Sequence, residues 1–263
     1  MQNDMTLVTQ QLGHGRRLSL IHGWAMHSGL FNGLSHELAR FSQVDCLDLP
    51  GHGQAREQDW PASTEPLLEK LARQCQGGWL LGWSLGGLLA LMTARQHPES
   101  VAGVVMVAAT PCFAQRPHWP HGVAEPLVAQ LAHELEEGPE QVLNRFLALE
   151  VHGSQNAARD LRLLRDEAFR YGLPQPAALR QGLALLRETD LSRQLDDIEQ
   201  PVLLIGGRRD RLVPFEALRT SAERLPNAQL VQIAGAAHAP FLTDPRAVAE
   251  AIRHWLDPQR EGP

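Results

Sequence analysis

The stretch from residue 78 to residue 98 constrains the fold of this chain more than any other. Residues 79–83 form a short apolar run that predicts a buried strand, and residues 85–96 are rich in Leu, Ala and Met and predict a helix. The sequence GWSLGG joins them and fits the pattern G-x-S-x-G, with Ser84 at its centre. So short a pattern arises by chance in many chains, but a strand before it and a helix after it are the context of a nucleophile elbow, in which a strained serine projects its Oγ from a sharp turn. Ser84 is therefore the candidate nucleophile.

The composition is that of an ordinary globular protein. The chain has 263 residues, of which 43% are hydrophobic and 21% are charged, and this length suffices for one sizeable domain. The formal net charge of −6 argues against a general nucleic-acid surface. The longest uninterrupted apolar stretch, residues 101–109, is too short to span a bilayer, and the N-terminal residues lack the basic–apolar–small order of a secretory signal. We expect a cytoplasmic monomer that binds neither nucleic acid nor a membrane.

The cysteines and histidines give no sign of a metal site. Cys46, Cys75 and Cys112 are odd in number, far apart and without a C-x-x-C pair, so we expect the reduced, structural thiols of a cytosolic protein. His118 and His121 lie three residues apart, but no carboxylate or cysteine joins them at the spacing of a zinc site. The sequence therefore predicts neither a metal nor an organic cofactor.

Strand and helix patterns alternate through the first part of the chain and again through its last part. The expected strands are residues 6–11, 16–21, 44–49, 79–83, 101–109, 201–207 and 228–233. The expected helices of the same parts are residues 30–40, 64–76, 85–96 and a last helix that ends at Trp255. Alternation of this kind predicts an α/β fold with a mostly parallel, doubly wound sheet.

The alternation stops between residues 111 and 187. This part has no convincing strand, and it shows helical patterns at residues 123–136, 140–150, 155–171 and 176–187. We interpret it as a helical lid inserted into a core made of residues 1–110 and 188–263. Open α/β sheets bind ligands at the carboxyl ends of their strands, so such a lid would cover the site.

Three candidate catalytic residues each follow a different predicted strand. They are Ser84, Asp210 and His238. The order serine, acid, histidine is that of the α/β-hydrolase fold, in which the histidine acts as general base and the acid orients it. A lone histidine is more often a core residue, but that explanation leaves the matching aspartate unexplained. Asp48 also ends a predicted strand, but the Pro-Gly turn after it favours a structural role.

The strand expected at residues 16–21 ends in His22, Gly23 and Trp24. In a serine hydrolase the loop after this strand supplies one backbone N–H of the oxyanion hole, and the residue after the nucleophile supplies another. We expect the N–H groups of Trp24 and Leu85 to fill these roles, with the His22 side chain in support. The alternative is an ordinary turn with a structural histidine.

Seven short motifs extend over nearly the whole chain. They are HGW at 22–24, DLPGHG at 48–53, LGWSLGG at 81–87, TPCF at 110–113, HWP at 118–120, RFLAL at 145–149 and AAHAPF at 236–241. Together they resemble the pimeloyl-[acyl-carrier protein] methyl ester esterases of biotin biosynthesis. The elbow and the HG pair are common to many α/β hydrolases, whereas the tryptophan before the serine, RFLAL and AAHAPF are narrower. The resemblance implies an α/β-hydrolase fold and a serine carboxylesterase that hydrolyses pimeloyl-[acyl-carrier protein] methyl ester and releases methanol.

The resemblance also implies roles for single residues. Ser84, Asp210 and His238 take the catalytic roles, and Trp24 and Leu85 form the oxyanion hole. The substrate-binding residues that it implies are Trp24, Ser84, Leu85, Phe146, Leu147, Ala148, Leu149, Glu150 and His238, of which those from Phe146 to Glu150 line the acyl channel.

The partner that the resemblance implies is an acidic acyl carrier protein, which the family docks on arginines of the lid. Arg145 and Arg162 match such positions. Gln141 and Ala158 stand at two others, although Arg159 lies beside the latter. The departure weakens the assignment of the docking residues and leaves the implied activity as it stands.

The arginines at positions 159, 162 and 165 fall on one side of the predicted helix, within an arc of about 120°. This arrangement favours docking of an acidic partner. The alternative is an ordinary solvated face of mixed charge, because the same segment holds Asp160, Asp166 and Glu167.

Two other functions stay open at this point. One is a general carboxylesterase of the same fold that acts on small free esters. The other is a non-catalytic small-molecule binding protein on this scaffold, because receptors can retain all three catalytic residues.

Overall fold

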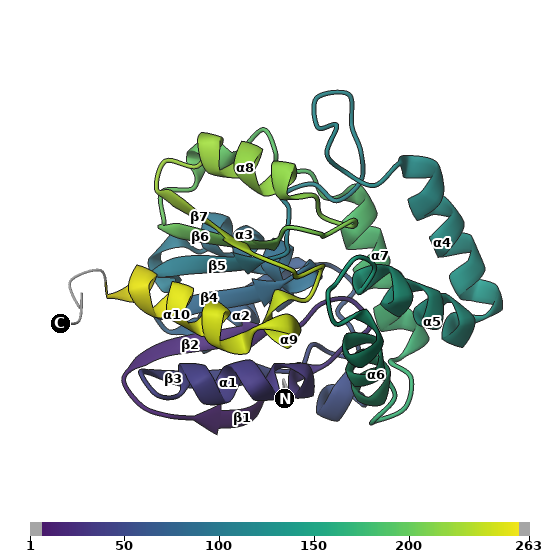
Figure 1. Ribbon diagram of the computed structural model, residues 1–263, viewed down its shortest axis with the longest axis horizontal. Helices are drawn as coiled ribbons and strands as arrows, with labels where there is room; N and C mark the ends of the chain where they lie inside the picture. Colours follow the sequence, from purple (N-terminus) through teal and green to yellow (C-terminus); the bar gives the residue numbers. More distant parts are fainter. Residues whose placement is uncertain (1–6, 258–263) are drawn as a thin grey trace.

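The structure is a computed structural model that describes residues 7–257 and contains a seven-stranded sheet (Figure 1). The strand order is β1-β3-β2-β4-β5-β6-β7, with β1 antiparallel to β3 and every other neighbouring pair parallel. The strands are β1 (Val8–Leu12), β2 (Arg16–Ile21), β3 (Ser42–Leu47), β4 (Trp79–Trp83), β5 (Gly103–Val107), β6 (Val202–Gly207) and β7 (Ala228–Ile233). The predicted mostly parallel sheet is confirmed. The first strand was expected to begin at Thr6, which lies outside the described residues.

The central strands are apolar because helices cover both faces of the sheet. Every residue of β4, β5 and β6 is buried. Successive side chains point to opposite faces, so Leu80 of β4 packs into the hydrophobic cluster on one face and Leu81 into the cluster on the other. Full burial of one such side chain is worth about 1.5–3 kcal/mol. The central strands therefore anchor both helical layers.

Two layers of helices flank the sheet (Figure 1). The first layer holds α1 (Asn32–Leu38) and α10 (Pro245–Leu256), which pack against each other. The second holds α2 (Glu65–Cys75), α3 (Leu85–Gln96) and α8 (Phe215–Arg224). No sequence pattern predicts α8, because only three of its ten residues are buried and its apolar stripe is correspondingly short.

The last predicted helix is in fact two helices. The first, α9 (Pro240–Thr243), ends before Asp244, and α10 begins at Pro245. The Asp244 carboxylate accepts a hydrogen bond of 2.9 Å from the N–H of Ala247 and so caps α10. Proline fits the first position of a helix because its missing N–H would have no partner there.

Four helices connect β5 to β6 and lie together beyond the ends of these strands (Figure 1). They are α4 (Glu125–Glu137), α5 (Pro139–Glu150), α6 (Ala157–Ala168) and α7 (Pro176–Glu188). This segment rests on the core, because α7 contacts α3 and α6 contacts the 3-10 turn Ser28–Phe31. None of the helices within residues 7–257 is long and apolar enough to cross a membrane.

Candidate active site

Ser84 lies in the turn between β4 and α3 and has a strained backbone. Its φ of 54° and ψ of −117° are values that residues with a side chain rarely adopt. Glycines allow strand and helix to approach closely at this turn. A Cβ on Gly82 would lie 2.1 Å from the carbonyl oxygen of Gly86, and a Cβ on Gly86 would lie 2.2 Å from the carbonyl oxygen of Ile21. The structure thus has the sharp turn that the GWSLGG sequence predicts.

The side chains of Ser84, His238 and Asp210 form one hydrogen-bonded chain. The Oγ of Ser84 lies 2.9 Å from Nε2 of His238, and Nδ1 of His238 lies 2.8 Å from Oδ2 of Asp210. The other oxygen of Asp210 accepts hydrogen bonds of 2.9 Å from the backbone N–H groups of Leu212 and Val213. All three side chains are buried. The structure therefore brings together the three residues expected from chain order, with His238 placed to accept the serine proton.

The surroundings of His238 favour uptake of that proton. Burial of the imidazole lowers the pKa of His238, but the charge of Asp210, its hydrogen bond and the charge of Glu150 outweigh burial and hold the pKa above its usual value. The indole N–H of Trp83 donates a hydrogen bond of 2.7 Å to the backbone oxygen of His238. The residue before the serine thus also fixes the loop that carries the histidine.

The loop after β2 lies directly against Ser84. A Cβ placed on Gly23 would be only 3.3 Å from the Cβ of Ser84. Within residues 7–257, the backbone N–H groups of Trp24 and Leu85 donate to no other group, so both are free to bind an oxyanion. Burial lowers the pKa of His22 to about 3, and the neutral ring supports the loop through a 2.8 Å hydrogen bond between Nδ1 and the oxygen of Gly23.

Asp48, the other candidate acid, accepts hydrogen bonds from backbone N–H groups and not from a histidine. Its two carboxylate oxygens accept hydrogen bonds of 2.7 Å from the N–H groups of Ser28 and Gln54. The side chain is buried, and its hydrogen bonds do not involve His238. The arrangement agrees with the structural role that the Pro-Gly turn after Asp48 favours.

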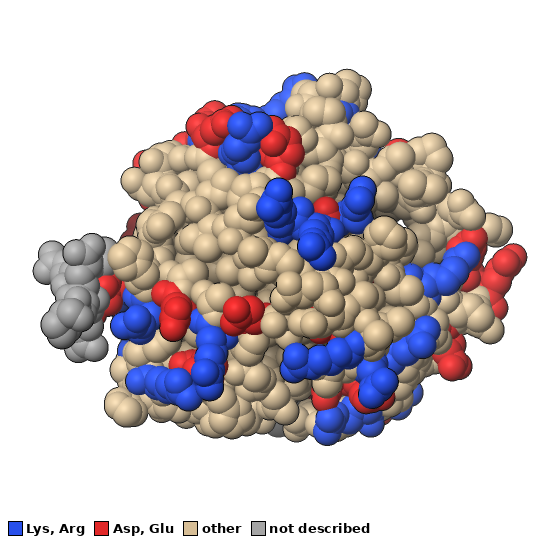
Figure 2. Space-filling view, in the orientation of Figure 1, with Lys and Arg blue, Asp and Glu red and all other residues tan. Residues whose placement is uncertain are grey.

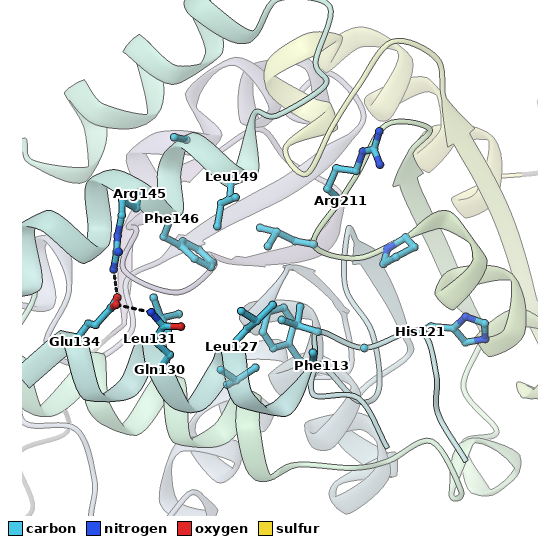
Figure 3. Close-up of a pocket in the computed structure, with 17 residues that line it drawn as sticks. Phe113, His121, Leu127, Gln130, Leu131, Glu134, Arg145, Phe146, Leu149 and Arg211 are labelled. Carbon is cyan, nitrogen blue, oxygen red and sulfur yellow. Dashed lines mark hydrogen bonds and ion pairs between the residues drawn. The ribbon is translucent and has the colours of Figure 1, made fainter. Parts of the chain in front are cut away.

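An apolar pocket of about 700 Å³ lies next to the loop that follows Asp210 (Figure 3). Helix α4 contributes Leu127 and Leu131 to its lining, α5 contributes Phe146, and the loop after β6 contributes Leu212. The ring of Phe146 also packs edge to face on Trp24, with centroids 4.9 Å apart. The pocket therefore borders the loop of the candidate acid, and the Phe146 ring lies between the pocket and Trp24 of the loop after β2.

The side chains of residues 146–150 lie in three different environments. Phe146, Ala148 and Leu149 line the pocket, as the resemblance implies. Leu147 is outside the pocket lining and packs into the hydrophobic cluster that includes α10. Glu150 is buried next to His238. The division follows from helix geometry, because a step of about 100° per residue turns neighbouring side chains to different sides.

The similarity of this chain to known proteins extends over most of its length. The model of the alpha/beta hydrolase family matches residues 20–251. The chain belongs to the alpha/beta hydrolase family. A relative from Xanthomonas oryzae pv. oryzae (strain MAFF 311018), named pimeloyl-[acyl-carrier protein] methyl ester esterase, is 43% identical over 245 residues, which are 93% of this chain and 96% of that protein. A relative of the same name from Xylella fastidiosa (strain M23) is 41% identical over 246 residues, which are again 93% of this chain and 96% of that protein. The predicted resemblance and the prediction of a carboxylic ester hydrolase are confirmed.

Solved structures of other alpha/beta hydrolases share the fold. A hydrolase from Oleispira antarctica has a TM-score of 0.83 at 20% identity and covers 97% of both chains. An esterase from Exiguobacterium antarcticum has a TM-score of 0.80 at 21% identity and covers 94% of both chains. At such low identity these structures bear on the fold alone.

Glu150 is a buried acid of this alpha/beta hydrolase. Its backbone oxygen accepts a hydrogen bond of 3.0 Å from the N–H of His238, and its Oε2 has no hydrogen-bond partner within residues 7–257. Burial raises the pKa of Glu150 to about 8; the positive charge of His238 opposes this rise, and the negative charge of Asp210 adds to it. The sequence gives no sign of this environment, because a glutamate at the end of a helix is usually solvated.

Replacing Glu150 by glutamine should leave the acid limb of the pH profile of this hydrolase nearly unchanged. The charge of Glu150 raises the pKa of His238 only where Glu150 is ionised, and with a pKa of about 8 the carboxyl is protonated near pH 6. The acid limb of kcat/KM should therefore shift by less than about 0.3 pH units. A pH profile with a neutral ester at constant ionic strength checks this. A clear shift of the acid limb to lower pH would mean that Glu150 is ionised during turnover.

The two histidines of the loop before α4 bind different partners. Nε2 of His118 lies 2.8 Å from the carboxylate of Asp190, and Nε2 of His121 lies 3.2 Å from the hydroxyl of Thr220. Within the described part of the chain, no group of three or more His, Cys, Asp or Glu side chains is placed to hold a metal ion. The cysteines are free and buried, namely Cys46, Cys75 and Cys112.

Proposed function

We propose that this protein hydrolyses the methyl ester of pimeloyl-[acyl-carrier protein] to pimeloyl-[acyl-carrier protein] and methanol in biotin biosynthesis. The observation that carries the proposal is the 43% identity, over 93% of the chain, to a relative of that name. The hydrogen-bonded serine, histidine and aspartate beside an apolar pocket support it, because the reaction needs a nucleophile and room for an acyl chain.

In the proposed mechanism the Oγ of Ser84 attacks the carbonyl carbon of the methyl ester. Nε2 of His238 takes the serine proton, while Asp210 keeps Nδ1 protonated and stabilises the imidazolium. The N–H groups of Trp24 and Leu85 bind the oxyanion of the tetrahedral intermediate. One such donor is worth about 3–4 kcal/mol of transition-state stabilisation.

Two further steps complete the proposed cycle. The tetrahedral intermediate breaks its bond to the methoxy oxygen, which takes the proton from His238 and leaves as methanol, so the acyl chain remains on Ser84 as an ester. A water molecule then attacks the carbonyl carbon of this ester while His238 accepts a proton from the water. When the second tetrahedral intermediate collapses, His238 returns the proton to the Oγ of Ser84 and the carboxylic acid is released. The cycle requires no metal or organic cofactor.

We assign residues 111–187 as the lid of this enzyme and the apolar pocket as its acyl channel. The pocket lies between α4 and α5 of this segment and the loop after β6 of the core. Phe146 borders the pocket on one side and Trp24 on the other, so its ring lies where the chain would enter the catalytic site. Apolar walls suit the methylene chain of the substrate.

The exposed side of α6 is the proposed docking surface for the acidic carrier protein. Arg159, Arg162 and Arg165 are exposed and form no ion pair with any residue in the described range. Figure 2 shows basic side chains gathered over the region of α6. Arg145, the third arginine implied by the resemblance, differs because it pairs with Glu134 of α4. We therefore propose that Arg159 and Arg162 contribute more to docking than Arg145.

The acids of the same helix neutralise these arginines less than their number suggests. Asp160 is buried and accepts a hydrogen bond of 2.6 Å from the hydroxyl of Ser154. Glu167 pairs with Arg170. Of the three acids only Asp166 is exposed. A face with more free cations than free anions favours an acidic partner over the alternative of an evenly mixed surface.

Reversing the charge of Arg159 and Arg162 together should weaken use of the carrier-bound ester. Exposed charges at an interface set the encounter rate and its salt dependence. The double variant with Glu at both positions should raise KM for the carrier-bound methyl ester about tenfold or more and flatten its dependence on salt. Turnover of a small neutral ester should change little, because the catalytic residues lie beneath this surface.

The matched control for that variant reverses Arg246 and Arg253 of α10, which changes the net charge equally at another face. Steady-state kinetics on both substrates at low and high salt decide the outcome. An equal loss on the carrier-bound and the neutral ester would mean that Arg159 and Arg162 hold the lid together, and the docking assignment would then be dropped.

Growth tests the pathway assignment. A bacterial strain that lacks the esterase of biotin synthesis should grow without biotin when it expresses this chain, and it should not grow with the Ser84→Ala variant. A chain that hydrolyses small esters in vitro but does not restore growth would favour the second candidate, a general carboxylesterase. The open apolar pocket of about 700 Å³ is the observation that favours that candidate, since it has room for many acyl groups.

A further inference from the structure

Among residues 7–257, the apolar pocket has one positively charged side chain without an ionic partner. Arg145 and Arg211 stand on opposite sides of it (Figure 3). Arg145 is neutralised by its ion pair with Glu134. The side chain of Arg211 is exposed and forms neither an ion pair nor a hydrogen bond with any residue from 7 to 257. The pocket therefore combines apolar walls with a single free guanidinium at its edge.

Two more arginines strengthen the positive potential at this edge. Arg208 and Arg209 are exposed and belong to the same loop after β6 as Arg211. Figure 2 shows basic side chains gathered around the ends of β6 and β7. All three arginines line a second, open groove, which meets the apolar pocket at Arg211. Asp210 forms no ion pair with these arginines, because its carboxylate is buried and accepts hydrogen bonds from His238 and from backbone N–H groups.

The free guanidinium stands at the edge of the pocket, on the loop that carries the catalytic acid. Arg211 directly follows Asp210, and the N–H of the next residue, Leu212, binds the Asp210 carboxylate at 2.9 Å. Leu212 also lines the apolar pocket. Phe146 lines the pocket and packs on Trp24, so an acyl chain from Ser84 would enter the pocket beside this ring, pass apolar side chains and end near a cation. The ligand that matches apolar walls followed by a cation is an aliphatic chain with an anionic group at its far end.

We propose that this hydrolase also acts on free half-esters of medium-chain dicarboxylic acids, with the ester at Ser84, the methylene chain in the apolar pocket and the distal carboxylate on Arg211. The inference rests on the esterase part of the proposed function and adds a class of substrates that need no carrier. Water cleaves the ester bond, and the products are the dicarboxylic acid and the alcohol. A guanidinium suits the carboxylate because it donates two parallel hydrogen bonds to it.

The test compares two series of methyl esters of equal chain length, one made from dicarboxylic acids as monomethyl esters and one from monocarboxylic acids. The measured quantity is the ratio of kcat/KM for the charged ester to kcat/KM for the neutral ester. Arg211→Gln should lower this ratio about three- to tenfold, the range for a partly exposed guanidinium–carboxylate pair. Arg253→Gln, an exposed arginine of α10 outside the site, should leave the ratio as in the wild type.

Chain length provides a second readout. The wild-type ratio should reach a maximum at one length, because a ligand held at both ends gains most when its length matches the distance between the two sites. An unchanged ratio in Arg211→Gln would overturn the inference. An equal fall of the ratio in Arg253→Gln, or a wild-type ratio that declines steadily with chain length, would also overturn it, because either result indicates only the general positive potential of the protein surface.

The carrier-bound ester separates this inference from the proposed function. If the wild type hydrolyses the half-esters with the expected ratio but not the carrier-bound ester, the carrier proposal fails and the half-ester inference stands. If it hydrolyses the carrier-bound ester while Arg211→Gln leaves the half-ester ratio unchanged, only the half-ester inference fails. If Arg211→Gln lowers kcat/KM for the carrier-bound ester, the neutral esters and the half-esters equally, Arg211 supports the pocket in general and the half-ester inference is overturned.

Discussion

Replacing Ser84 by alanine is expected to lower kcat for every ester substrate about 10⁴- to 10⁶-fold. The Oγ of Ser84 is the one atom placed to attack the substrate, and its hydrogen bond of 2.9 Å to His238 is the path by which its proton leaves. The fold should survive, because the substitution removes a single small atom and leaves the strained turn between Gly82 and Gly86 intact. Initial rates with a chromogenic short-chain ester and the thermal unfolding midpoint measure the two effects.

Covalent labelling controls this experiment. A serine-directed phosphonate should add once to the wild type, at Ser84, and should not add to Ser84→Ala. Activity of the variant within about tenfold of the wild type would contradict the assignment, because it lies far above the residual activity expected without a nucleophile. Labelling of another serine in the wild type would contradict it equally.

Replacing Asp210 by asparagine is expected to lower kcat about 10⁴-fold. The Asp210 carboxylate accepts the Nδ1–H of His238 at 2.8 Å and thereby keeps Nε2 free to take the serine proton. An amide at this position favours the other tautomer and removes the charge that stabilises the imidazolium. The steady-state rate with the chromogenic ester at the pH optimum measures the loss, and circular dichroism checks that the variant is folded.

Asp48→Asn is the matched control, because Asp48 is also a buried aspartate after a strand of the same sheet. Its carboxylate accepts two backbone hydrogen bonds and does not contact His238. We expect the control to keep kcat within about tenfold of the wild type and to lose about 1–3 kcal/mol of unfolding free energy, as for a weakened buried hydrogen-bond network. Exchanged results, with a large kcat loss in Asp48→Asn alone, would make Asp48 the catalytic acid.

The core of the fold was predictable because its signals are local. Residues 79–83 are apolar throughout, and β4 has these same bounds in the structure. The glycines of GWSLGG specify a turn that no larger residue permits, since a Cβ on Gly82 would collide with the backbone of Gly86. Asp210 and His238 were predictable from chain order, because parallel strands place their carboxyl ends at one edge of the sheet.

The features that escaped prediction depend on contacts between distant segments. Asp160 counts as a surface acid in the sequence, but Ser154 and Thr243 surround its carboxylate and it is only 2% exposed. Glu150 ends a helix, yet it is buried because the loop of His238 covers it. Neither environment leaves a periodic pattern, since burial of a single polar side chain is decided by which loop packs over it.

The apolar pocket is likewise a product of tertiary packing. Its lining comes from two helices, from the loop before α4 and from the loop after β6. The amphipathic pattern of α4 does not distinguish a side chain that faces a pocket from one that faces a filled core. The free charge of Arg211 also emerges only from the structure, which shows which arginines have acidic neighbours and which have none within the described residues.

The most direct test of the proposed function is the intact mass of an acyl carrier protein that bears a pimeloyl methyl ester, followed during incubation with this enzyme. Such a substrate offers two carbonyl carbons to Ser84, one in the methyl ester and one in the thioester that joins the chain to the carrier. We predict that the carrier loses the mass of one methylene group and keeps its acyl chain, and that it stays unchanged with Ser84→Ala. Loss of the whole acyl chain, or an unchanged carrier in a preparation that hydrolyses a chromogenic ester, would contradict the proposed function.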